Sequence, residues 1–90
     1  MAHTKFENLN DILNELDVIR KLQGLKEVKP GIFYFKSTPF LHFHDKDGKR
    51  WAHVKCDGVW KVVLVNFNPI KSQREKFCKI VRQAFHRISN

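Results

Sequence analysis

Residues 40–56 read FLHFHDKDGKRWAHVKC, two alternating segments on either side of Asp47-Gly48. Alternation of apolar with polar or aromatic residues is typical of a β-strand with one face in the core. Asp-Gly is a favoured pair for a two-residue hairpin turn. With this turn, Phe43 lies opposite Ala52, and the apolar side chains of both strands share one face. The segment therefore predicts an antiparallel hairpin.

Alternation continues on both sides of this hairpin, between turn-forming residues. The turn Ser37-Thr38-Pro39 would join a preceding strand. A three-residue loop, Cys56-Asp57-Gly58, would join a following strand and place Trp60, Val62 and Leu64 on the core face. We predict four strands in a meander, at residues 32–36, 40–45, 49–56 and 59–66.

Helical periodicity flanks the predicted sheet. Apolar residues recur at three- and four-residue steps between Thr4 and Gly24, and again between residues 72 and 88. Ser72 and Glu75 have the spacing of a capping box at the start of the second helix. The chain is thus predicted to be one α+β domain over residues 1–90, with an N-terminal helix, a four-stranded antiparallel meander and a C-terminal helix.

Length and composition limit the classes of function. The 90 residues are 42% hydrophobic, enough for one compact core but too few for an enzyme with a separate cofactor domain. Cys56 and Cys78 form neither a disulfide framework nor a catalytic motif, and no Gly-rich phosphate loop or nucleophile elbow is present. The missing catalytic motifs lead us to expect a non-enzymatic protein. With no signal-peptide or membrane-spanning stretch, we expect it to be cytoplasmic, with reduced thiols.

The hairpin register also fixes the face turned away from the apolar set. His42 lies opposite His53 on that face, and His44 is the same-face neighbour of His42. A His-x-His strand beside a third histidine can converge three imidazoles on one zinc ion and leave a coordination position open. His42, His44 and His53 are therefore candidate metal ligands. The alternatives are polar histidines on a solvated face, or hydrogen-bonded histidines covered by another element such as the first helix.

This His-Phe-His run resembles the zinc-binding strands of carbonic anhydrases. The resemblance covers only those few residues, and the chain is too short for that fold. Beyond Asp45, which strand parity places on the opposite face, no acidic residue is available to orient the histidines.

The function that we favour from the sequence is that the same face binds an anionic or protein partner, with the metal site as the alternative. The chain has 17 Lys+Arg against 9 Asp+Glu, a net charge of +8, and the first helix is acidic, so the positive charge lies in the rest. Rings that stack on bases, among lysines that neutralise phosphates, would bind nucleic acid. The predicted binding residues are Tyr34, Phe40 and Trp51 for stacking, and Lys36, Lys55 and Lys61 for phosphate. An acidic protein, or a second copy forming a homodimer, could instead cover the apolar residues of this face.

Two short motifs together resemble the signature of a small bacterial family of uncharacterised proteins. They are Pro30-Gly31-Ile32-Phe33-Tyr34 and Phe40-Leu41-His42-Phe43-His44-Asp45. The resemblance implies a bacterial cytosolic protein and brings no established activity.

Overall fold

The computed structural model describes residues 4–89 and confirms the α+β class. It has five strands, one more than predicted. The elements in chain order are the 3-10 helix η1 (Phe6–Ile12), α1 (Leu13–Arg20), β1 (Leu25–Lys29), β2 (Ile32–Phe35), β3 (Thr38–Lys46), β4 (Lys49–Cys56), β5 (Val59–Leu64) and α2 (Lys71–Ser89).

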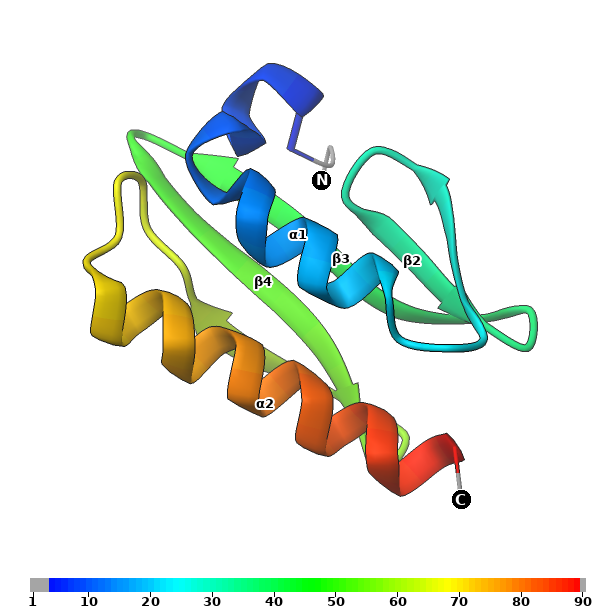
Figure 1. Ribbon diagram of the computed structural model, residues 1–90. Helices are drawn as coiled ribbons and strands as arrows, with labels where there is room; N and C mark the ends of the chain where they lie inside the picture. Colours follow the sequence, from blue (N-terminus) through cyan, green and yellow to red (C-terminus); the bar gives the residue numbers. More distant parts are fainter. Residues whose placement is uncertain (1–3, 90) are drawn as a thin grey trace.

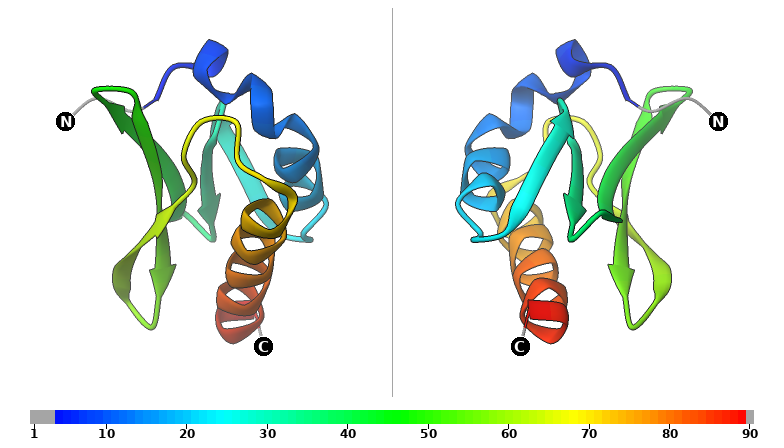
Figure 2. Two further views of the ribbon diagram at one scale, coloured as in Figure 1. Left: turned by 90° about the vertical axis from the view of Figure 1, so that its left-hand side faces the viewer. Right: turned by 90° about the vertical axis from the view of Figure 1, so that its right-hand side faces the viewer.

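The strands form one antiparallel sheet in the order β1-β2-β3-β4-β5, and α1 and α2 both lie on the same side of it (Figures 1 and 2). One apolar core fills the space between the two layers. We call the opposite side the outer face. Neither helix crosses to that face, so the expectation that the first helix could cover the histidines is wrong.

The first helix is shorter and less regular than predicted. Its first part, η1, is a 3-10 helix, and α1 ends at Arg20 rather than near Gly24. After α1, the chain enters β1, an additional strand that apolar alternation does not reveal because three of its five residues are charged. Glu27 on this edge strand accepts hydrogen bonds from Arg20 Nε at 2.7 Å and Nη2 at 3.0 Å. This ion pair holds the end of α1 against β1.

The final helix matches its prediction to within one residue at each end. Its inner stripe, made of Phe77, Val81, Ala84 and Phe85, is buried against the sheet. The N-terminal cap differs from the predicted Ser72–Glu75 box, because the side chain of Gln73 accepts the hydrogen bond from the N–H of Ile70 at 3.2 Å. Within residues 4–89, no helix combines the length and apolar character needed to span a membrane.

The central hairpin has the predicted register. Phe43 pairs with Ala52, and His42 pairs with His53. Asp47 and Gly48 have φ of 54° and 76°, the left-handed conformation that a two-residue type I′ turn requires at both positions. Local turn chemistry and the apolar pattern specify the same register.

The β2–β3 connection differs from its prediction and moves Phe40 into the core. Phe35 pairs with Thr38, so the turn is Lys36-Ser37. The register then shifts along β2 and β3, which is the mark of a bulge, and the side chains of Phe40 and Leu41 are both buried. Phe40 packs edge-to-face on Phe85 with 6.2 Å between ring centroids. Its predicted place on the outer face is wrong.

The β4–β5 connection reverses the faces predicted for β5. Cys56 pairs with Val59, so the turn has two residues, Asp57-Gly58, instead of three. A shift of one residue exchanges the two faces of a strand. Trp60, Val62 and Leu64 consequently share the outer face with the histidines, whereas Lys61, Val63 and Val65 lie on the helix side.

The buried side chain of Arg50 joins three parts of the chain that are distant in sequence. It is fully buried, and all five of its N–H groups donate hydrogen bonds. Asp11 accepts two of them, at 2.6 and 3.0 Å, and the guanidinium lies 4.7 Å from the centroid of the Phe67 ring. The other acceptors are the carbonyl oxygens of Asn8, Val65 and Asn66. Arg50 therefore connects η1 to β4 and to the loop before α2.

The carboxyl of Asp11 is held ionised by this network. Burial alone would raise its pKa, but hydrogen bonds from Arg50 and from the N–H of Asn68, together with the charge of Arg50, outweigh burial. The pKa of Asp11 therefore lies below its usual value.

Candidate metal centre on the outer face

Three histidine side chains converge on the outer face, and β3 and β4 position them. His42 and His44 are two residues apart on β3, and His53 is the direct cross-strand partner of His42. One ligand nitrogen from each ring lies within 4.8 Å of the other two. The Nε2 atom of His42 and the Nδ1 atom of His53 are 2.9 Å apart and share a hydrogen bond. The predicted cluster is thus present.

Two tryptophan rings flank the cluster. Trp51 lies 6.0 Å from His44, and Trp60 lies 4.5 Å from His42, both between ring centroids. His44 is only 6% exposed, although it stands on the face away from the helices. The two indole rings therefore border the histidine cluster on the outer face.

The pKa of His53 is shifted in the direction that favours metal binding. Burial lowers this pKa, and the electrostatic interaction with His44 lowers it further. A neutral imidazole is the form that coordinates a metal ion.

The lowered pKa of His53 predicts a loss of stability in acid. The unfolded chain, with its histidine pKa near 6.5, binds a proton more readily than the folded protein does. We therefore expect the free energy of unfolding to fall as the pH drops through about 6.5. Urea denaturation at a series of pH values would measure this, with chelator present throughout. In His53→Gln the slope in this window should be smaller, and an unchanged slope would contradict the assignment.

The spacing of the three nitrogens suits a tetrahedral ion after small side-chain rotations. Such an ion, with bonds of about 2.0–2.1 Å, holds its ligand atoms roughly 3.3 Å apart. The histidine nitrogens lie from 2.9 Å up to 4.8 Å from one another. Binding would replace the hydrogen bond between His42 and His53 by two bonds to the ion. The three imidazoles would leave one coordination position for water or a ligand.

The predicted phosphate- and base-binding residues do not all share this face. Tyr34, Trp51 and Lys55 do, and Lys55 Nζ lies 4.3 Å above the Trp60 ring. Lys36 lies in the β2–β3 turn. Phe40 is buried in the core and Lys61 lies on the helix side of the sheet, so neither belongs to the outer face. Cys56 and Cys78 are free thiols outside the metal cluster, and burial raises the pKa of Cys78.

The prediction from sequence overlooked the roles of two residues, although the sequence contains an indication of each. Trp60 was assigned to the core, although Asp57-Gly58 is the same dipeptide as Asp47-Gly48 and favours the same two-residue turn. In the predicted strand, Arg50 lies on the same face as Ala52, so the register directs a charged side chain toward the core. A cation at such a position requires a buried anionic or carbonyl partner.

Comparisons of the chain with protein-family models, with curated proteins and with solved structures find no match. The resemblance to a small bacterial family therefore stays a prediction. The fold is that of a two-layer α+β protein. Its function must therefore be inferred from the histidine cluster and the outer face.

Proposed function

We propose that this protein binds a divalent transition metal ion of the zinc type through His42, His44 and His53. The observation that carries the proposal is the convergence of three imidazole nitrogens, from two adjacent strands, within 4.8 Å of one another. Imidazole nitrogen is a favoured ligand of zinc, copper and nickel. The strand pairing holds two of the ligands directly opposite each other before any ion binds, which reduces the ordering cost of binding.

The surroundings of the site favour binding over metal-dependent catalysis. Within residues 4–89, the metal-ligand cluster contains imidazoles alone, with no carboxylate. A hydrolytic zinc site needs a group that accepts a proton from the bound water or orients its ligands. We therefore propose a non-enzymatic metal-binding protein, acting in the cytoplasm, where Cys56 and Cys78 stay reduced.

Zinc titration followed by NMR tests the proposal directly. One equivalent of zinc should shift the imidazole signals of His42, His44 and His53 together and leave those of the exposed His86 unchanged. Chelator should reverse the shifts, and acidification below about pH 6 should weaken binding because protonated imidazole cannot coordinate. Unchanged site signals in excess zinc, or equal shifts at His86, would refute the site.

A single-stranded nucleic acid is the second candidate ligand of the outer face. The stack of Lys55 on Trp60 favours it, because ring and cation together resemble a stacking platform with a phosphate contact. Acidic pH separates the two functions, since protonated histidines would strengthen phosphate binding and abolish metal binding. Tryptophan quenching by short oligonucleotides, strongest in acid and at low salt, would support the nucleic-acid function. Absence of quenching at low salt would exclude it.

A further inference from the structure

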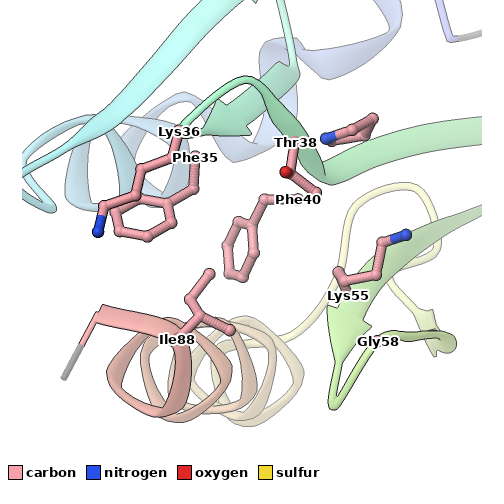
Figure 3. Close-up of a pocket in the computed structure, with 8 residues that line it drawn as sticks. Phe35, Lys36, Thr38, Phe40, Lys55, Gly58 and Ile88 are labelled. Carbon is pink, nitrogen blue, oxygen red and sulfur yellow. The ribbon is translucent and has the colours of Figure 1, made fainter.

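A cavity of about 320 Å³ opens between the β2–β3 turn, the end of β4 and the last turn of α2 (Figure 3). It is separate from the metal ligands, none of which lines it. Its lining is largely apolar and consists of Phe35, Lys36, Thr38, Pro39, Phe40, Lys55, Gly58 and Ile88. A volume of this size is at the lower end of the range for small-molecule sites.

The apolar wall of this cavity is held firmly by the core. Phe40 is 1% exposed and Phe35 is half-buried, and both rings pack edge-to-face on Phe85 of α2. Ile88 faces these rings from the last turn of the same helix (Figure 3). An apolar ligand would therefore enter a preformed pocket without reorganising the core.

Two lysines flank the apolar wall, one on each side (Figure 3). The Nζ atom of Lys36 lies 5.3 Å from the centroid of the Phe35 ring, and that of Lys55 lies 4.3 Å from the centroid of Trp60. No acidic residue lines the cavity, and neither lysine forms an ion pair with another described residue. The ammonium group of Lys55 lies on the outer face, whereas that of Lys36 lies beside a lining ring, so the rim at Lys36 is positive and complementary to an anionic group.

The backbone at the rim is unfavourable for the residues that occupy it. Lys36 and Ser37 have φ of 50° and 67°, in the left-handed region. A two-residue turn of this kind favours Asn-Gly or Asp-Gly, as at Asp47-Gly48 and Asp57-Gly58. A lysine in this position costs stability, and strain of this kind is concentrated at ligand sites.

We propose that this cavity binds a small molecule with an apolar chain ending in a carboxylate. The chain would lie against Phe35, Phe40 and Ile88, and the carboxylate would contact the ammonium group of Lys36 at the rim. This site is independent of the proposed metal centre. Medium-chain fatty acids have this chemistry, and octanoate is a suitable probe below its micellar concentration.

An NMR titration with octanoate, in the presence of chelator, tests the proposal without interference from metal coordination. Backbone signals of Lys36, Thr38 and Gly58 and the methyl signals of Ile88 should shift together and saturate at millimolar octanoate. Octylammonium has the same chain with the opposite charge and should leave these signals unchanged. No saturable shift with octanoate, or equal shifts with octylammonium, would overturn the proposal.

Two substitutions in one turn separate ligand binding from stability. Lys36→Asn removes the ammonium group but relieves the strained backbone, so octanoate affinity should fall about fivefold while the protein becomes no less stable. Ser37→Gly relieves the same turn, keeps both lysines, and should leave the affinity unchanged. Thr38→Trp, at an exposed strand position, should block the mouth and abolish binding. Unchanged affinity in both Lys36→Asn and Thr38→Trp would refute the site.

Discussion

Replacing Arg50 with methionine should lower the free energy of unfolding by about 3–5 kcal/mol, because it leaves the Asp11 carboxylate partly buried without its cation. Three backbone carbonyls would lose their donor at the same time. Small domains have total stabilities of about 5–15 kcal/mol, so much of the stability would be lost. Urea denaturation at neutral pH, followed by tryptophan fluorescence, would measure the change.

Arg20→Ala is the matched control for this prediction. Arg20 also pairs with a carboxylate through two hydrogen bonds, but its side chain is 32% exposed, whereas that of Arg50 is fully buried. Partly exposed pairs of this kind contribute about 0–1 kcal/mol. If Arg50→Met and Arg20→Ala proved equally mild, the network around Arg50 would not hold η1, β4 and the loop before α2 together.

His42→Ala should weaken zinc binding on the order of 100-fold, because removal of one of three protein ligands leaves too few to hold the ion. The three rings are about equally close, with centroid distances of 4.7 Å between His42 and His44, 4.8 Å between His44 and His53, and 5.0 Å between His42 and His53. Calorimetric titration with zinc at neutral pH, with chelator competition to define the affinity, would measure the loss.

His86→Ala is the corresponding control, since His86 is exposed on α2 and lies outside the cluster. It should leave the affinity and the stoichiometry of one ion per chain unchanged. His44→Ala and His53→Ala should each resemble His42→Ala if all three rings ligate one ion. A variant series in which the His42, His44 and His53 changes have no greater effect than His86→Ala would exclude the proposed function.

The central hairpin and its histidine cluster could be predicted because the information is local. Asp47-Gly48 favours one turn, the apolar alternation requires the same register, and this register alone places His42 beside His53. The helix at the C-terminal end was equally predictable, since its apolar stripe repeats over several turns.

The outer strands were less predictable because their positions depend on single-residue choices. The predicted three-residue loop, in place of the two-residue turn Asp57-Gly58, exchanged the two faces of β5. The prediction therefore put Trp60 in the core and Lys61 beside the histidines, the reverse of the structure. The bulge at Phe40 has no local signature, and β1 is too short and charged to show alternation. At β5 and at Phe40, the apolar pattern near the error was compatible with two registers.

The sequence by itself determined the α+β class, the β3–β4 register and the convergence of His42, His44 and His53, because adjacent residues encode all three. Only the tertiary structure decided that both helices lie on one side, that Phe40 closes a cavity with Ile88, and that Arg50 is buried with Asp11. These features join residues separated by 39 or more positions, as Arg50 and Asp11 are. Their partners are chosen by packing and by the need to satisfy buried polar groups, which no short stretch of sequence specifies.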